Sequence, residues 1–277
     1  MAKLCASIAI VAPACRVDNA LADHLISFVK ERYGAGAPTL FFHPQCFLSE
    51  GHFAGSDSER TKAFVDVANN TDFDAVWFAR GGYGAGRLDP ALFGQLSDEA
   101  HTKTYIGYSD LGVLLGRLYK ESIGRIVHGA MPSDIKRAKG GPAIGRVLDF
   151  LVNGDEVGLE PNHRHEKRAA FNITVLSHMV GTPYEPDLSG HILMLEDVAE
   201  YHYRLDRSLF TIFNSPKMRN LKGVMLGRCS DIPDNDPAFE KGEVEIVQDW
   251  CAKAAIPYLG RADIGHDADN KVVVFGA

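Results

Sequence analysis

A chain of 277 residues is long enough for one large domain or for two modest ones, each with its own apolar core. Its formal net charge of −7 argues against a general binder of nucleic acid or of anionic membranes, because both functions need a basic surface. No apolar run reaches membrane-spanning length, the amino terminus lacks the features of a secretory signal, and the five cysteines fit neither a disulfide framework nor a zinc site. We therefore expect a cytoplasmic protein with reduced thiols.

The first half of the chain alternates short apolar runs with amphipathic stretches, which is typical of strand–helix units over a parallel sheet. The run SIAIVAPA, which begins at Ser7, is rich in β-branched residues and predicts a buried central strand. Ser56 and Glu59 have the spacing of a capping box and predict the start of a helix that runs to about Asn69. Helices are also expected from about 21 to 34 and over 111–120, and strands at 39–43, 74–79, 103–107 and 125–129.

The second half has a different texture. Between about Met131 and Lys167, basic residues and glycines surround a single apolar helix, IGRVLDFLV, and we interpret this stretch as a linker. The pattern predicts an α/β domain over 1–130, the linker over 131–167 and a smaller β-rich domain over 168–277. In that last part, strands are expected at 191–196, 223–227 and 271–276, and helices near 202–214 and 242–253.

The sharpest local feature of the sequence is Gly107-Tyr108-Ser109-Asp110. Here an apolar strand ends at a glycine, turns through a serine and enters a helix, which would expose the Ser109 hydroxyl at the carboxyl edge of a sheet. The positive end of the helix would favour an oxyanion in a transition state. The alternative is structural, because a serine in front of a helix is usually its N-cap.

The glycine-rich segment RGGYGAGR, over 80–87, follows another predicted buried strand. Such a loop lets backbone N–H groups approach either a phosphate or a tetrahedral oxyanion. The phosphate reading is the weaker of the two, because Arg87 occupies the place of the last glycine in G-x-G-x-x-G. A tight structural turn between a strand and a helix would have the same composition.

A nucleophilic serine needs a histidine base, and the histidine needs an orienting acid. His266 lies in a glycine-flanked turn between two strand-like runs, and His128 ends a strand near the predicted sheet edge of Ser109. His163 and His165 lie in a charged stretch and are expected to be solvated. Glu196 ends the apolar run HILMLE, where a carboxylate must reach solvent or meet a partner.

Taken in order, these motifs resemble those of the LD-carboxypeptidase family of serine peptidases, which also includes the self-immunity peptidases that cleave microcin C. The resemblance covers nearly the whole chain. The shared segments are APA after the first strand, GHFAGSDSER, AVWFARGGYGAGRL, YIGYSDLGVLL, IVHG, GTPYEPDLSGHILMLEDVAEYHYRLDR, GVMLGRC and DIGHDADNKVVVFG.

The resemblance implies that Ser109 is the nucleophile, His266 the general base and Glu196 the residue that orients the base. It also implies an oxyanion hole formed by the backbone N–H groups of Gly82 and Asp110. The implied fold is a flavodoxin-like domain followed by a smaller β-rich domain, with the active site between them, in a homodimer. No metal or organic cofactor is expected.

One departure from the family pattern concerns the start of the second domain. Relatives often carry a GGN-type segment there, whereas this chain has Ala170-Phe171-Asn172 and keeps only the asparagine. Since that segment approaches the site in relatives, we expect Phe171 to reshape the pocket.

By the same resemblance, the substrate is the murein tetrapeptide, cut between meso-diaminopimelate and the terminal D-alanine during cell-wall recycling. A carboxypeptidase needs a cationic group for the terminal carboxylate, and Arg80 and Arg204 are the candidates. Tyr83 and Tyr108, in the same motifs, complete the predicted substrate-binding residues.

Three alternatives remain at this point. A microcin-type peptidase would need an aromatic shelf for a nucleobase, and neither Trp77 nor Trp250 is an obvious shelf. A non-catalytic ligand-binding protein could use the same two-domain plan, with Ser109 serving only as a helix cap. A nucleotide-dependent enzyme would use the segment 80–87 as a phosphate loop.

Overall fold

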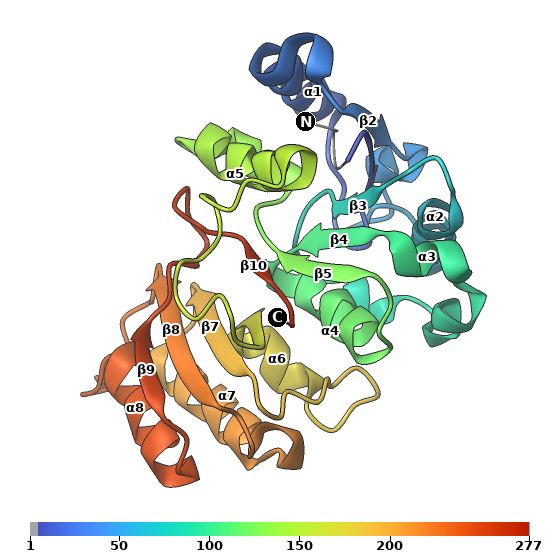
Figure 1. The fold of residues 1–277 in the computed structure, drawn as a ribbon. Helices are drawn as coiled ribbons and strands as arrows, with labels where there is room; N and C mark the ends of the chain where they lie inside the picture. Colours follow the sequence, from blue (N-terminus) through green and yellow to red (C-terminus); the bar gives the residue numbers. More distant parts are fainter. Residues whose placement is uncertain (1–4, 277) are drawn as a thin grey trace.

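Two open sheets form the framework of the computed structural model, which describes residues 5–276 (Figure 1). The first sheet has six strands in the order β10-β5-β4-β3-β1-β2, all parallel except β10. The second has four parallel strands in the order β6-β7-β8-β9. The order β2-β1-β3-β4-β5 is that of flavodoxin-like folds, so the expected architecture of a flavodoxin-like domain followed by a smaller second sheet is confirmed.

The elements follow the predicted positions closely in the first half of the chain. The strands of the first sheet are β1 (Ser7–Val11), β2 (Thr39–Phe42), β3 (Ala75–Phe78), β4 (Thr104–Gly107), β5 (Arg125–His128) and β10 (Val273–Val274). Those of the second are β6 (Arg168–Asn172), β7 (Ile192–Val198), β8 (Gly223–Ser230) and β9 (Tyr258–Arg261). The helices are α1 (Asn19–Tyr33), α2 (Asp57–Asn69), α3 (Asp98–Thr102), α4 (Gly112–Lys120), α5 (Gly140–Asn153), α6 (Ile173–Met179), α7 (His202–Asn214) and α8 (Glu243–Ala254).

Helices cover both faces of the first sheet, as burial of an all-apolar parallel sheet requires. On one face, α1 and α5 pack with β1 in a cluster that includes Leu25, Val147 and Ile10. On the other face, α2 and α4 contribute to the larger apolar cluster, which continues into the second sheet. The predicted capping box is confirmed, because Ser56 and Glu59 exchange hydrogen bonds at the start of α2.

The two sheets share structure near their boundary. α5, from the stretch predicted to be a linker, packs on the first sheet, and β10, near the end of the chain, pairs with β5 (Figure 1). Phe275, just after β10, contacts Phe171 of β6 with ring centroids 5.2 Å apart. Helices α7 and α8 pack against each other, and α8 contacts β8 and β9 of the second sheet. The predicted domain limits therefore differ from the two sheets at α5 and β10. α5 packs on the first sheet although it lies in the predicted linker, and β10 belongs to that sheet although it lies in the predicted second domain.

The order of the strands in the first sheet determines where a ligand can enter. β1 lies between β2 and β3, so the chain leaves β1 toward one side of the sheet and builds β3, β4 and β5 on the other. The loops after β1 and β3 therefore diverge at the carboxyl edge, and crevices at such switch points are the usual ligand sites of open α/β sheets. Ser109 follows β4 at the same edge.

Within residues 5–276, no helix has the length and apolar character needed to cross a membrane.

A fully buried arginine fastens the loops at this edge. Arg60 of α2 is 0% exposed, and its Nη1 donates to the carbonyl oxygens of Pro13 (2.5 Å) and Gly84 (2.9 Å). Its Nε donates to the carbonyl of Gly55, and its Nη2 pairs with Asp57. One side chain thus joins the loop after β1 to the glycine-rich loop after β3.

Replacing Arg60 with methionine should lower the free energy of unfolding by about 2–4 kcal/mol, because it leaves buried carbonyls without a donor and Asp57 without one of its partners. Urea denaturation monitored by circular dichroism would measure the loss. Arg87→Met is the matched control, because Arg87 pairs with the same Asp57 from a half-exposed position. Equal stability of Arg60→Met and wild type would show that the buried hydrogen bonds contribute nothing net.

Candidate active site

Ser109 occupies a strained position between β4 and α4. Its φ is +58°, a value that a residue with a side chain adopts only when its surroundings enforce it. A short 3₁₀ turn over Ser109–Leu111 leads into α4, so the predicted strand–turn–helix arrangement is confirmed. The Ser109 hydroxyl makes no cap hydrogen bond at either helix start, so the N-cap interpretation of this serine does not fit.

The Ser109 hydroxyl instead contacts a histidine from the far end of the chain. His266 Nε2 lies 2.9 Å from Ser109 Oγ, across 157 residues of sequence. His266 Nδ1 lies 2.5 Å from Oε2 of Glu196, which is 0% exposed at the end of the buried part of β7. The structure thus brings Ser109, His266 and Glu196 together in the order that a hydroxyl, a base and an orienting acid require.

The hydrogen-bond partners define the proton positions. An ionised carboxylate only accepts hydrogen bonds, so Nδ1 of His266 carries the proton and donates a hydrogen bond to Oε2 of Glu196. Nε2 is then free to accept the hydrogen bond donated by the Ser109 hydroxyl. Burial lowers the pKa of His266, but the charge and hydrogen bond of Glu196 outweigh it, so the pKa is raised above its ordinary value.

A second set of hydrogen bonds connects the segments that carry Ser109 and His266. Tyr108 donates its hydroxyl to Oδ1 of the buried Asp134 (2.9 Å), whose Oδ2 accepts from the backbone N–H of Met131 (2.8 Å). Arg137 donates Nε to the same Oδ1 (2.8 Å) and a terminal N–H to the carbonyl of His266. The segment after β5 therefore connects Tyr108, the residue before Ser109, to the backbone of His266.

Tyr108 is 2% exposed and its hydroxyl is engaged by Asp134. This position does not fit the predicted role of Tyr108 in substrate binding, because the side chain is buried and its hydroxyl is already bonded to Asp134. Its ring lies 4.8 Å from that of His266 and 5.5 Å from that of His128. His128 is itself buried, and burial lowers its pKa to about 3, so it is a neutral packing residue behind Tyr108.

The glycine-rich loop after β3 approaches the nucleophile closely. A Cβ on Gly81 would lie 3.3 Å from Ser109 Oγ, so only a glycine backbone fits here without a shift of its neighbours. Gly82, the predicted oxyanion-hole residue, has a φ of +94°, and its backbone N–H forms a hydrogen bond that lowers the pKa of the Asp110 carboxyl. Burial outweighs this effect and raises that pKa overall. Gly82 and Asp110 thus lie together beside Ser109.

Cys15, in the loop after β1, supports Gly82 from the opposite side. A Cβ on Gly82 would lie 2.6 Å from the Cys15 sulfur, which in turn contacts Nε2 of His52 at 3.2 Å. Burial raises the pKa of the Cys15 thiol. Cys15 is therefore a packing residue beneath the loop, and the sequence offered no signal for this contact.

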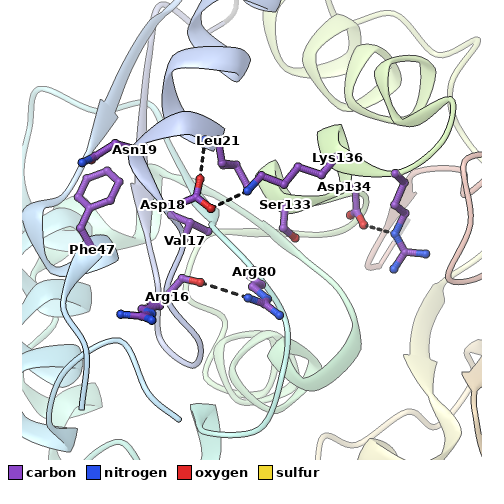
Figure 2. Close-up of a pocket in the computed structure, with 11 residues that line it drawn as sticks. Arg16, Val17, Asp18, Asn19, Leu21, Phe47, Arg80, Ser133, Asp134 and Lys136 are labelled. Carbon is purple, nitrogen blue, oxygen red and sulfur yellow. Dashed lines mark hydrogen bonds and ion pairs between the residues drawn. The ribbon is translucent and has the colours of Figure 1, made fainter. Parts of the chain in front are cut away.

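The remaining predicted binding residues lie in three separate hollows. Tyr83 is 59% exposed and lines a cavity of about 330 Å³ with Asp110 and Tyr184. Arg204 of α7 pairs with Glu200 at 3.6 Å and lines a different hollow beside α6. Arg80 lies in the largest of the three, a cavity of about 740 Å³ at the carboxyl ends of β1 and β3 (Figure 2).

Phe171 does not line the site, contrary to our expectation. It is 1% exposed and packs against Phe275 in the core between the two sheets. The neighbouring Asn172 donates to Oδ1 of Asp197 (2.8 Å), and the other oxygen of Asp197 accepts from the backbone and hydroxyl of Thr174. These bonds fix the end of β6 beside Glu196.

Among residues 5–276, no cluster of histidine, cysteine or carboxylate side chains could hold a metal ion.

Family models agree with this geometry. Residues 8–129 match the LD-carboxypeptidase N-terminal domain and residues 170–277 match the LD-carboxypeptidase C-terminal domain. The chain therefore belongs to the LD-carboxypeptidase family and is a serine-type carboxypeptidase, as the sequence motifs predicted.

Individual relatives are more distant. The murein tetrapeptide carboxypeptidase of Pseudomonas aeruginosa is 29% identical over 243 residues, which cover 81% of this chain and 78% of that protein. A probable murein peptide carboxypeptidase of Bacillus subtilis is 27% identical over 82% of this chain and 74% of its own length.

Solved structures share the whole fold. The muramoyltetrapeptide carboxypeptidase of Oxalobacter formigenes superposes with a TM-score of 0.80 at 26% identity, over 97% of this chain and 93% of that one. The microcin C7 self-immunity protein MccF superposes with a TM-score of 0.77 at 15% identity, over 100% of this chain and 93% of that one, which shows the fold alone.

Gly82→Ala should leave the protein folded but reduce kcat by about 100-fold. The strained φ and the contact with Cys15 would displace the backbone N–H that is predicted to bind the oxyanion, and loss of one oxyanion donor has an effect of this size. Steady-state kinetics and a thermal melt would separate the two effects. Gly94→Ala is the control, because a Cβ there meets open space; a Gly82→Ala enzyme with wild-type kcat would contradict the placement.

Glu196→Gln should lower kcat and shift the acid limb of the pH–rate profile to lower pH. The base must be neutral, so activity falls as pH drops through the raised pKa of His266. Without the carboxylate charge, burial dominates and that pKa falls. Profiles of kcat/KM between pH 5 and pH 9 would measure the shift. Asp269→Asn, exposed on the same loop, should leave the limb unmoved. A Glu196→Gln limb that stayed in place or moved to higher pH would contradict the assignment.

Proposed function

We propose that this protein removes the terminal D-alanine from the murein tetrapeptide, with Ser109 as nucleophile, His266 as general base and Glu196 as the orienting acid. The observation that carries the catalytic part is the pair of contacts that His266 makes, 2.9 Å to Ser109 and 2.5 Å to Glu196. The substrate is supported by the printed names of the relatives from Pseudomonas aeruginosa and Oxalobacter formigenes.

The proposed reaction follows from the proton positions. His266 takes the proton of the Ser109 hydroxyl as its oxygen attacks the carbonyl carbon of the scissile bond. The backbone N–H groups of Gly82 and Asp110 stabilise the oxyanion, and protonated His266 then gives its proton to the leaving amine of D-alanine. Water attacks the acyl-enzyme by the same route and restores the hydroxyl. Glu196 stays ionised throughout and holds the imidazole in one tautomer.

In the proposed mechanism, the strained backbone at Ser109 directs the hydroxyl toward His266. A φ of +58° turns the side chain out of the path of α4, so the hydroxyl faces His266 and not the helix N–H groups. Strain at a nucleophile is tolerated when the surrounding packing enforces it, and here the glycine-rich loop closes against the serine.

A microcin-type amide is the second candidate substrate. Trp77 is fully buried and donates its indole N–H to the carbonyl of Ala130, and Trp250 donates to Asp206 between α7 and α8, so neither offers a shelf for a nucleobase. Tyr83 is the aromatic side chain exposed beside Asp110, and it is the one observation that favours this alternative.

Two further expectations belong to the proposal. We expect the protein to act in the cytoplasm, where murein peptides are recycled, and to form a homodimer. The proposed steps use only side chains and backbone groups of the protein, with no metal or organic cofactor.

Ser109→Ala should reduce turnover by at least about 1,000-fold while leaving the fold intact, because within residues 5–276 Ser109 supplies the one hydroxyl hydrogen-bonded to His266. Mass-spectrometric detection of D-alanine released from disaccharide-tetrapeptide would compare the variant with wild type. Release by both proteins would refute the nucleophile. Absence of release by both would refute the substrate, and aminoacyl-nucleotide amides would then be tested.

A further inference from the structure

The largest cavity of the three lies at the topological switch point of the first sheet, and we name it the switch-point pocket (Figure 2). We propose that it is an anion subsite in which the guanidinium groups of Arg16 and Arg80 bind a carboxylate of the peptide substrate. This inference rests on the proposed function and specifies how the same site recognises its substrate. The pocket is lined by Arg16, Val17, Asp18, Asn19, Leu21, Phe47, Arg80, Ser133, Asp134, Lys136 and Arg137.

The charges of the pocket do not balance. Lys136 pairs with Asp18 at 2.6 Å, and Arg137 pairs with Asp134 at 2.8 Å, so these four side chains neutralise one another. Among residues 5–276, neither Arg16 nor Arg80 forms a salt bridge with a carboxylate within 4 Å, although Arg80 attracts the Asp18 carboxylate at longer range. Arg16 and Arg80 therefore give the pocket two positive charges that no carboxylate in the described part of the chain neutralises by direct contact.

The protein holds these two arginines close together. Arg80 Nη1 lies 3.4 Å from the carbonyl oxygen of Arg16, which brings the loop after β1 against the loop after β3 (Figure 2). Both side chains line the same cavity, so one bound anion can pair with both guanidiniums. A cavity lined by two guanidiniums at a switch point is an arrangement suited to anion binding.

The pocket also lies next to the reacting groups. Arg80 directly precedes Gly81, the glycine whose Cβ would lie 3.3 Å from Ser109 Oγ. Arg137, which also lines the pocket, donates a hydrogen bond to the carbonyl of His266. A substrate whose scissile bond reaches Ser109 can therefore place a carboxylate a few atoms away in the pocket.

The shape of the donor favours a carboxylate over other polar groups. A guanidinium presents two parallel N–H groups that match the two oxygens of a carboxylate, and this geometry distinguishes it from an amide or a hydroxyl. The murein tetrapeptide carries carboxylates both on the leaving D-alanine and on its acyl part. Either could occupy the pocket, and the experiment below separates them.

The test compares Arg16→Gln and Arg80→Gln on the tetrapeptide and on analogues in which each carboxylate is amidated in turn. Each variant should reduce kcat/KM for the parent tetrapeptide by about 10-fold or more, mainly through KM. One amidated analogue should lose this sensitivity, and the position of its amide identifies the carboxylate that the pocket binds. Arg219→Gln, which removes an exposed arginine outside the pocket, is the control and should match wild type.

Two outcomes would overturn the proposal while wild type remains active. Unchanged kcat/KM in both variants would show that the arginines do not contact the substrate. An equal loss on the parent and on every amidated analogue would show that the substitutions merely distort the glycine-rich loop.

A binding measurement separates this proposal from the proposed function. Titration calorimetry would measure the binding of the tetrapeptide to Ser109→Ala and the binding of citrate to wild type. In each background, Arg16→Gln or Arg80→Gln should weaken the binding by about 10-fold or more. If wild type released no D-alanine, the proposed function would fail, and arginine-dependent binding of either probe would still support the pocket. The pocket proposal would be refuted if the arginine substitutions weakened the binding of neither the tetrapeptide nor citrate.

Discussion

The contact between His266 and Ser109 is the constraint on which the rest of the structure depends. The serine follows β4 of the first sheet, and the histidine belongs to a loop between the second sheet and β10. Glu196 comes from β7, so three segments far apart in sequence must agree within a few tenths of an ångström. Such accuracy requires rigid elements behind each side chain, and the pairing of β10 with β5 supplies one by returning the chain from the second sheet to the first.

The supporting contacts are polar and centre on the buried side chains of Arg60, Tyr108 and Asp134. Arg60 fixes the loops after β1 and β3 through backbone carbonyls, and Asp134 links Tyr108 to Arg137. Each of these bonds is charge-assisted, so removal of one partner leaves a buried group unsatisfied. One set of hydrogen bonds thereby joins the loops after β1 and β3, and the other joins Tyr108, next to Ser109, to the backbone of His266.

The site also shows why a catalytic centre and a binding pocket share one sheet edge. Parallel strands present all their carboxyl ends together, so the loops after β1, β3 and β4 meet there. The loops after β3 and β4 bring Gly82 and Ser109 together, and those after β1 and β3 bring Arg16 near Arg80. The proposed pocket and the proposed catalytic site are adjacent in sequence, because Arg80 directly precedes Gly81.

The sequence by itself determined the strand–helix alternation, the capping box of Ser56 and Glu59 and the turn at Ser109, and its family motifs singled out the three residues that we propose as the triad. Local patterns suffice for these features because they depend on neighbouring residues or on fixed spacing. Only the tertiary structure decided that Tyr108 and Phe171 are buried supports, that α5 and β10 join the first sheet, and that Arg16, Asp134 and Arg137 lie near the site. Burial, pairing and pocket formation depend on contacts between distant segments, and no local spacing encodes which of those segments will meet.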